Sequence, residues 1–258
     1  MKIETYFPSA ILSRFIREYK IVESQEAATN YVLPDTAIVL AFRFNMPLVN
    51  IGGFLRNPPG TLVTGISPSA RNIAYPKGAK TLLILFREGG AAAFFRLPFY
   101  EIFGASISLE DLLPNDIVNE IESNLHEART DQQRIMIVES FLLGILSNTD
   151  SDKLIAYAVQ QIKKDKGQTN IRKLAGLLNI SIDPFEKRFR KLTGTTPKHF
   201  SAIIKLRETI QMYPTVNKLT DLVYEMNYFD QSHFIKDFKR FTGKTPGEFF
   251  RNGAQKVW

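Results

Sequence analysis

The 258-residue sequence contains no cysteine and only three histidines. Without cysteine the chain has no disulfides, no thiolate metal site and no thiol nucleophile. The histidines, His126, His199 and His233, lack the spacing of a metal site, so neither a metal nor another cofactor is expected. A glycine-rich phosphate loop and a G-x-S-x-G nucleophile motif are also missing. These absences argue against an enzyme.

Long apolar runs are missing as well. No run approaches the roughly 20 residues that a membrane helix needs, and the opening MKIETYFPSA lacks the basic-then-apolar layout of a signal peptide. The hydrophobic content of 44% and the charged content of 23% are ordinary for a globular protein. We therefore expect a folded cytoplasmic protein that has no membrane partner.

Positive charge is concentrated toward the C-terminus. Residues 1–148 carry 13 Lys and Arg against 15 Asp and Glu, whereas residues 149–258 carry 20 against 11, within a total net charge of +7. A basic half of this kind indicates a polyanionic partner, nucleic acid before a membrane surface. A basic face that is merely solvated is the alternative explanation.

Short apolar and β-branched runs characterise the first part of the chain. Residues 31–44, 60–67 and 80–86 are separated by Pro, Gly and Asn, which predicts an antiparallel barrel or sandwich. Arg43 and Arg87 lie within these apolar runs. They are expected to alternate outward, although an inward arginine would be a good anchor for an anion.

Helical spacing replaces the strand pattern further along. Apolar residues recur every three or four positions within residues 114–147, and this segment could cover the barrel, dock the second half of the chain or form a dimer. The polar stretch SNTDSD at 147–152 is the predicted boundary. We expect a β-rich sensor or interaction domain at 1–148 and an all-helical domain at 149–258.

Two stretches of the second domain are near copies: FEKRFRKLTGTTPKHF at 185–200 and FIKDFKRFTGKTPGEFF at 234–250. Each carries an apolar stripe at i, i+4 and i+7, which predicts one buried helix face. Upstream of the stripes, the copies are 48 residues apart at Asn179 and Asn227 but 49 apart afterwards. The second turn is therefore one residue longer than the first.

Both copies contain the same helix-terminating signals. Ser181 and Asp230 are suitable N-caps, and Ile180 and Phe229 are expected to pack on the first phenylalanine of each stripe as a hydrophobic staple. Gly194 and Gly243 can end the helices in the left-handed conformation. Thr-Pro then starts a new helix each time, with Glu248 completing a capping box in the second copy.

A short helix, a tight turn and a strongly capped basic helix together form a helix-turn-helix pattern. The phenylalanine stripes belong to the core, so the residues opposite them are the candidates for DNA contact. A solvated surface side chain is the alternative for each of them. The candidates are Ile182, Asp183, Glu186, Lys187 and Arg190 in the first copy, and Gln231, Ser232, His233, Lys236, Lys239 and Arg240 in the second.

The segments GLLNISIDPFEKRFRKLTGTTPKHF and NYFDQSHFIKDFKRFTGKTPGEFF, joined by a long helical pattern, resemble the AraC/XylS transcription regulators over about residues 150–252. The resemblance implies that each recognition helix enters one of two major-groove segments of double-stranded DNA, roughly 34 Å apart. It implies base-facing positions at Asp183, Glu186 and Lys187, and at Gln231, Ser232, His233 and Lys236.

Two departures from the family pattern matter. Asn227 stands where the second turn usually has glycine, a mild change because asparagine tolerates the same backbone. Asp183 and Glu186 place negative charge where DNA must approach. Carboxylates can accept from cytosine N4 but repel phosphate, so we expect the second unit to bind DNA more strongly.

The first domain, with VLPDTAIVLAF and LFREGGAAAFFRLPFYEI, resembles an N-terminal domain often found ahead of such modules and is similar to a cupin-like β-barrel sensor. The predicted fold is therefore α+β and multidomain: a β-barrel-like domain with helices, then two helix-turn-helix units. The predicted function is a transcription regulator with an effector or protein partner at the first domain. RNA polymerase contact, homodimerisation and nucleoid association are further expectations.

An alternative is a DNA-binding protein without a small-molecule effector, whose first domain serves protein interaction or dimerisation. A closed, polar-lined cavity within residues 1–110 would favour a sensor. An exposed apolar patch would favour a protein partner.

Overall fold

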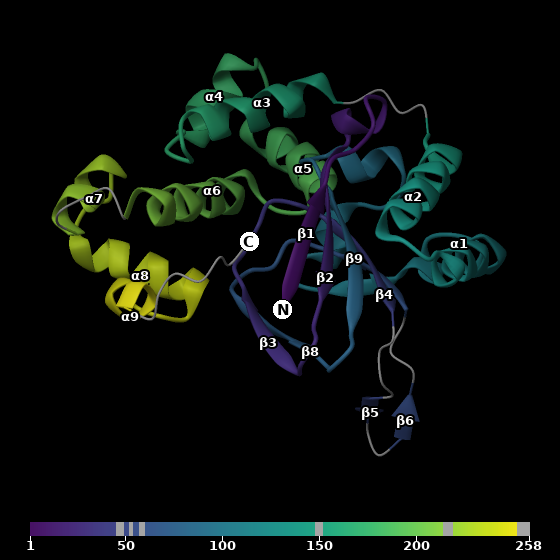
Figure 1. The fold of residues 1–258 in the computed structure, drawn as a ribbon. Coiled ribbons are helices and arrows are strands. Elements are labelled where there is room, and N and C mark those ends of the chain that lie inside the picture. Colours follow the sequence, from purple (N-terminus) through teal and green to yellow (C-terminus); the bar gives the residue numbers. More distant parts are fainter. Residues whose placement is uncertain (45–48, 52–53, 57–59, 148–151, 214–218, 252–258) are drawn as a thin grey trace.

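The computed structural model describes residues 1–44, 49–51, 54–56, 60–147, 152–213 and 219–251. A sheet-rich N-terminal part is followed by a helical part, which confirms the predicted fold class (Figure 1). Most of the expected break at 147–152 lies outside the described residues. The boundary between 148 and 149 therefore stays a prediction.

An antiparallel six-stranded sheet forms the centre of the N-terminal part. Its strands, in spatial order, are β1 (Lys2–Tyr6), β2 (Ile16–Glu23), β9 (Lys80–Phe86), β4 (Val39–Phe44), β7 (Thr61–Thr64) and β10 (Ser106–Ser108). Successive side chains in a strand point to opposite faces. In β4, Leu40 and Phe42 therefore point into the core on one face, whereas Ala41 and Arg43 point to the other.

Two shorter ribbons accompany the sheet. Strand β3 (Ala28–Val32) pairs with β8 (Arg71–Tyr75) and lies across the second face, so that both line a common cavity with β4 and β9. Strand β5 (Val49–Ile51) pairs with β6 (Phe54–Arg56) in a ribbon that extends away from the sheet (Figure 1).

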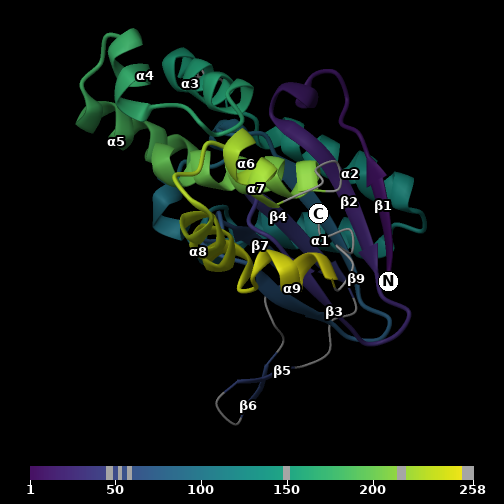
Figure 2. The ribbon, with the colours of Figure 1, turned by 90° about the vertical axis from the view of Figure 1, so that its left-hand side faces the viewer.

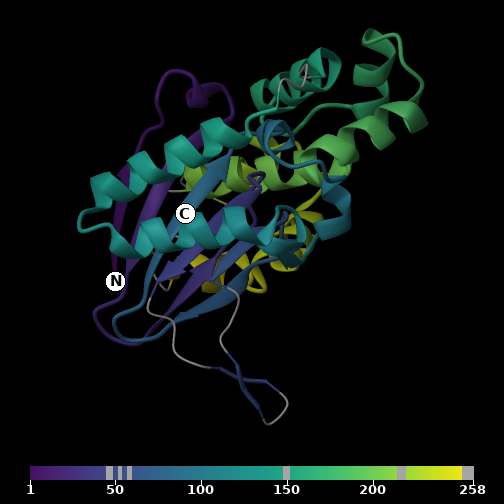
Figure 3. The ribbon, with the colours of Figure 1, turned by 90° about the vertical axis from the view of Figure 1, so that its right-hand side faces the viewer.

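Helices α1 (Asn115–Glu127) and α2 (Asp131–Ile145) cover the first face of the sheet, as Figure 3 shows. Their apolar stripes are buried, and Lys80 Nζ on β9 lies 2.7 Å from an oxygen of Asp131 on α2. The hydroxyl of Tyr19 donates to Glu139 at 3.1 Å. The sequence left three roles open for residues 114–147. In the structure this segment covers the sheet.

Short 3-10 turns complete the N-terminal part: η1 (Leu12–Arg14), η2 (Gly90–Ala93), η3 (Phe99–Ile102) and η4 (Leu109–Asp111). The glycine pair Gly89-Gly90 acts through turn geometry. Gly89 has φ +81°, and a Cβ on Gly90 would lie 2.2 Å from the carbonyl oxygen of Phe15. Only glycine fits such a backbone approach.

Seven helices are described in the C-terminal part: α3 (Lys153–Lys164), α4 (Ile171–Leu177), α5 (Ile182–Thr193), α6 (Pro197–Met212), α7 (Leu219–Glu225), α8 (Gln231–Thr242) and α9 (Pro246–Arg251). The pairs α4–α5 and α7–α8 are the two predicted units, and α6 joins them. Phe185 and Phe189 of α5 are fully buried in a core cluster of the first unit. Phe234 and Phe238 of α8 belong to a cluster that is continuous with the N-terminal core.

The large sheet lies between two layers of helices, with α1 and α2 on one side and α6, α8 and α9 on the other (Figures 2 and 3). Among the helices that the structure describes, none is both long and apolar enough to cross a membrane. The described residues also contain no cluster of three His, Cys, Asp or Glu side chains that could hold a metal ion.

Candidate nucleic-acid interface

The turns of the two units share a left-handed asparagine. Asn179 has φ +51° and Asn227 has φ +50°, so both asparagines adopt the left-handed backbone conformation expected of them. In the second unit Tyr228 follows Asn227 and packs its ring 5.2 Å from that of Phe234. Phe229 is therefore the extra residue that makes the second turn longer.

The predicted hydrophobic staple forms in only one unit. Ile180 is partly buried against the core cluster that contains Phe185, as expected. Phe229 is 93% exposed, so its predicted contact with Phe234 is wrong. The inserted residue shifts the register of the turn, and Tyr228 takes the packing position instead.

The ends of the recognition helices are held by local hydrogen bonds. At the start of α8, the backbone N–H of His233 donates to Asp230 at 2.6 Å. Ser181 is the N-cap of α5, but its hydroxyl makes no capping hydrogen bond. Both helices end at a left-handed glycine, with φ +88° at Gly194 and +66° at Gly243. These positive angles fix where each unit stops.

Thr-Pro restarts the chain as a helix in both copies. Thr196 accepts a hydrogen bond from the N–H of His199 at 3.2 Å. Thr245 accepts from the N–H of Glu248 at 3.4 Å, and Glu248 accepts from the N–H of Thr245 at 2.8 Å. The predicted capping box is therefore present.

The predicted DNA-contacting residues of α8 all lie on its exposed side. Asp237, on the same helix, is partly exposed; its carboxylate lies 3.8 Å from His233 Nε2 and 3.5 Å from the Arg240 guanidinium. The ring of His233 also packs 5.7 Å from that of Tyr228. The exposed candidates are Gln231, Ser232, His233, Lys236, Lys239 and Arg240.

The predicted residues of α5 are less uniform. Asp183 and Lys187 are exposed, and Glu186 is half-buried. Ile182 packs against the core cluster of the first unit. The guanidinium of Arg190 lies 4.8 Å from the centre of the Tyr100 ring in η3, so this arginine contacts the N-terminal part. The α8 candidates thus lie together on one exposed surface. The α5 candidates do not, because some face solvent, one packs in the core and one contacts the N-terminal part.

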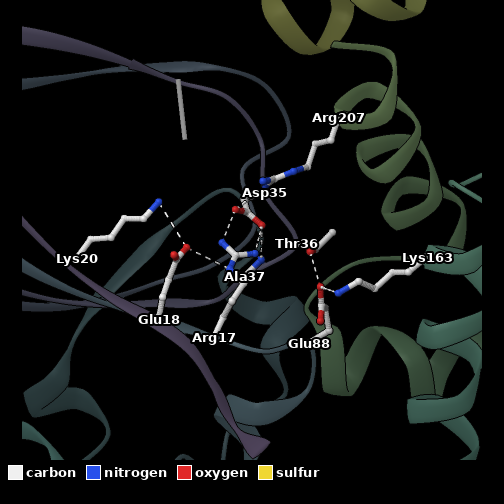
Figure 4. A network of polar contacts seen from close by, with 9 residues as sticks. All are labelled: Arg17, Glu18, Lys20, Asp35, Thr36, Ala37, Glu88, Lys163 and Arg207. Carbon is white, nitrogen blue, oxygen red and sulfur yellow. Dashed lines mark hydrogen bonds and ion pairs between the residues drawn. The ribbon is translucent and has the colours of Figure 1, made fainter. Parts of the chain in front are cut away.

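A largely buried acid joins the N-terminal part to the helix between the units (Figure 4). Asp35 receives two hydrogen bonds from Arg17, at 2.6 and 3.0 Å, and lies 2.6 Å from the guanidinium of Arg207 on α6. Burial disfavours the charged carboxylate, but the bonds and charges of the two arginines outweigh it and lower the pKa of Asp35 well below its usual range. Asp35 is therefore an ionised contact between the two parts of the chain.

A second polar contact lies beside it. Glu88 accepts from the hydroxyl of Thr36 at 2.8 Å and lies 3.0 Å from Nζ of Lys163 on α3 (Figure 4). Sequence spacing could not predict the ion pairs Asp35–Arg207 and Glu88–Lys163, because the partners are more than 70 residues apart. The C-terminal part, called the helical domain below, thus contacts the N-terminal part, called the sheet domain, at α3 and at α6.

The second unit touches the sheet domain through its recognition helix as well. The N–H of Ala70 donates to the carbonyl of Phe241 at 2.7 Å, and the hydroxyl of Tyr31 donates to the carbonyl of Thr242. The Lys244 ammonium lies 4.7 Å from the centre of the Tyr31 ring. The last turn of α8 is consequently held on the β3–β8 ribbon.

Comparison with known proteins bears on both parts. Residues 174–252 match the family described as "Helix-turn-helix domain", and residues 4–108 match "Domain of unknown function (DUF6597)". The "HTH-type transcriptional regulator MtrA" of Neisseria gonorrhoeae is 27% identical over 117 residues, which cover 45% of this chain. The match spans only 38% of the length of that relative.

Solved structures of ToxT from Vibrio cholerae are also similar. One, in the P21 crystal form, has a TM-score of 0.47 at 10% identity and covers 90% of this chain and 96% of its own. Another, bound to (E)-4-(8-methylnaphthalen-1-yl)but-3-enoic acid, has a TM-score of 0.45 at 13% identity over 96% and 98%.

The residue pattern, the two helix-turn-helix units and the match to a transcriptional regulator agree on the nature of the second part of the chain. The two helix-turn-helix units therefore lie largely within the residues that match a helix-turn-helix family, 174–252, and the sheet-rich part lies largely within the residues that match DUF6597, 4–108.

Proposed function

We propose that the protein is a sequence-specific DNA-binding transcription regulator that reads two adjacent major-groove segments. The observation that carries this proposal is the duplication of a helix-turn-helix unit with matching turns and helix ends around α6. Residues near the start of a recognition helix reach base edges, and flanking Lys and Arg neutralise phosphates. On α8, Gln231, Ser232, His233 and Lys236 take the first role, and Lys239 and Arg240 the second.

The two units contribute unequally. The start of α5 carries an exposed carboxylate at Asp183 and a half-buried one at Glu186. Both repel phosphate, although either can accept from cytosine N4. The start of α8 has no acid among Gln231, Ser232 and His233, so most of the affinity comes from the second unit.

The N-terminal domain regulates DNA binding through its contacts with the helical domain. Ion pairs at Arg207 on α6 and Lys163 on α3 tie the helical domain to the sheet domain, and the Arg190–Tyr100 contact and the contacts at the end of α8 tie the first and second units to it. A change at the sheet domain therefore alters how the two recognition helices are held. Contact with RNA polymerase, homodimerisation and location on the nucleoid belong to the same proposal.

In a second candidate function, the protein binds DNA without a small-molecule effector and its N-terminal domain binds a protein partner. The groove between α1 and α2 is lined mainly by apolar side chains, including Ile117, Met136 and Phe141, with a few polar ones among them, and Met136 is 61% exposed. Such a surface suits a protein partner. A cavity whose lining residues all fall within residues 3–106 favours the sensor instead, and it includes polar groups.

The proposal is tested by finding and then dissecting the operator. Genome-wide binding of the tagged full-length chain identifies its sites, and gel-shift titration compares operator with random DNA. Lys236→Ala is expected to weaken operator binding roughly 5- to 100-fold with less effect on random DNA. Lys239→Ala should weaken both and reduce the slope of log K against log salt by about 1.

Lys77→Ala is the matched control, because Lys77 is an exposed lysine of the sheet domain. It should leave both affinities unchanged. If Lys236→Ala discriminated operator from random DNA as well as the unaltered protein does, the assignment of α8 as the base-reading helix would be wrong.

A further inference from the structure

A cavity of about 280 Å³ lies between the second face of the large sheet and the β3–β8 ribbon. This volume is just below the roughly 300–1,000 Å³ typical of ligand pockets. Much of its wall is apolar, with Val39 and Leu85 from the sheet and Ile73 from the ribbon. A space of this kind accommodates the apolar body of a small molecule.

Two arginines face this cavity from opposite walls. Arg43 comes from β4, where it pairs with Thr81 of β9, and Arg71 comes from β8, where it pairs with Val32 of β3. The alternation of side chains in β4 places Arg43 on the cavity face, opposite to the buried Phe42 and Phe44. The expected outward orientation of Arg43 is thus wrong, because the β3–β8 ribbon covers this face of the sheet and Arg43 lines the cavity between them.

Neither guanidinium has a counter-ion among the residues that the structure describes. Burial lowers the pKa of Arg43, and burial together with the charge of Arg43 lowers that of Arg71. The Nε atom of Arg71 is buried without a hydrogen-bond partner. An unpaired charge removed from water is costly, and two like charges facing one space add repulsion.

The other charged groups of the cavity wall are already paired. Asp35 is bound by Arg17 and Arg207, and Lys20 lies 3.4 Å from Glu18. Tyr75 also lines the cavity, but burial raises the pKa of its hydroxyl, which keeps it neutral. An anion that enters the cavity is therefore the missing partner for the two arginines.

We propose that this cavity binds a small amphiphilic anion, with its oxyanion head on Arg43 and Arg71 and its apolar body against the sheet. The guanidinium fork matches a carboxylate or a phosphate ester, and charge-assisted bonds of this type are the strong ones. This inference deepens the proposed control by an effector and rests on it for the regulatory consequence. Binding itself requires no DNA.

Octanoate, octyl phosphate and octanamide are the probes for calorimetric titration of the full-length protein. Their shared alkyl chain is flexible enough to follow the cavity, and only the amide lacks charge. The anion with the fitting head group should bind at least about tenfold more tightly than octanamide. Comparing the two anions separates a carboxylate site from a phosphate site.

Arg43→Met and Arg71→Met test the assignment of the two arginines, with the exposed Arg96→Met as the control. Each cavity variant should lose roughly 10- to 100-fold in affinity for the tighter anion, and Arg96→Met should lose none. If a methionine variant fails to fold, Arg43→Lys and Arg71→Lys replace it. These keep the charge but lose the fork, and should still weaken binding.

Equal binding of both anions and the amide, or no binding of either anion, would overturn the proposal. Undiminished binding by both cavity variants would do the same. The gel shift with Lys236→Ala does not depend on any of these probes. A failure of the anion site is therefore distinguishable from a failure of the DNA-binding function.

Discussion

Single residues decide which side chains of the second unit face solvent. The repeat comparison located an extra residue in its turn, but sequence spacing did not reveal which of Tyr228 and Phe229 packs inward. In the structure the ring of Tyr228 packs on Phe234, and Phe229 is 93% exposed beside the start of α8. A large apolar side chain so close to base-reading positions can contact a thymine methyl group.

Phe229→Ala is expected to weaken operator binding roughly 5- to 100-fold while changing the free energy of unfolding by less than about 0.5 kcal/mol, because the side chain is almost entirely exposed. Phe234→Ala is the contrasting variant and should lose about 3–5 kcal/mol, since its ring is fully buried. Gel shifts and urea unfolding measure the two quantities. Unchanged operator affinity in Phe229→Ala would remove this residue from the interface.

At the scale of the element, helix ends were predictable because their signals are local. Asn179, Gly194 and Thr196 each act through the backbone of their own turn, and each has the conformation or the hydrogen bond expected of it. Strand pairing was less accessible, because the sheet order joins strands far apart in the chain, such as β2 and β9. Whether the Arg43 side chain points inward likewise depends on which strands cover its face of the sheet.

The two helix-ending glycines differ in their surroundings, which gives a prediction for the pair. A Cβ on Gly243 would meet open space, whereas one on Gly194 would lie 3.3 Å from both the Cδ1 of Ile38 and the carbonyl oxygen of Phe99. Gly243→Ala should therefore cost only the left-handed backbone, about 1–2 kcal/mol. Gly194→Ala should cost more, because it also crowds the contact between α5 and the sheet domain.

Urea unfolding of the two alanine variants, each compared with the unaltered protein, measures these costs. Gly176→Ala serves as a control within helix α4, where a Cβ meets nothing and φ is not positive. It should be neutral or stabilising by up to about 1 kcal/mol. If Gly194→Ala cost no more than Gly243→Ala, the tight contact at Gly194 would not contribute to stability.

At the scale of the whole molecule, the two domains pack against each other rather than being joined by a linker alone. The core of the second unit is continuous with that of the sheet domain, and Asp35 connects β-sheet and α6 through two arginines. The role of Asp35 depends on Arg207, which is far away in the sequence, so no local pattern could connect the two residues.

Asp35→Asn is expected to destabilise the protein by about 3 kcal/mol near pH 7, because Arg17 and Arg207 lose their shared anion. The pKa of Asp35 is lowered in the folded state, so the unfolded chain binds its proton first as pH falls. The contribution of Asp35 is therefore complete above the ordinary value of 3.8 and declines as pH falls below it. The difference between protein and variant should stay constant from pH 7 to 5 and shrink below about pH 4.

Urea unfolding at pH 7, 5 and 3 measures this difference, with Glu26→Gln as the control. Glu26 pairs with Lys77 at 3.2 Å, but both side chains are more than 70% exposed, and such pairs contribute about 0–1 kcal/mol. Hydrogen exchange adds the location of the effect: the amides of α6 should exchange faster in Asp35→Asn and not in Glu26→Gln. Equal stability of the two variants at pH 7 would mean that the buried acid does not hold the domains together, and control by the sheet domain would then have to pass through the contacts at the end of α8.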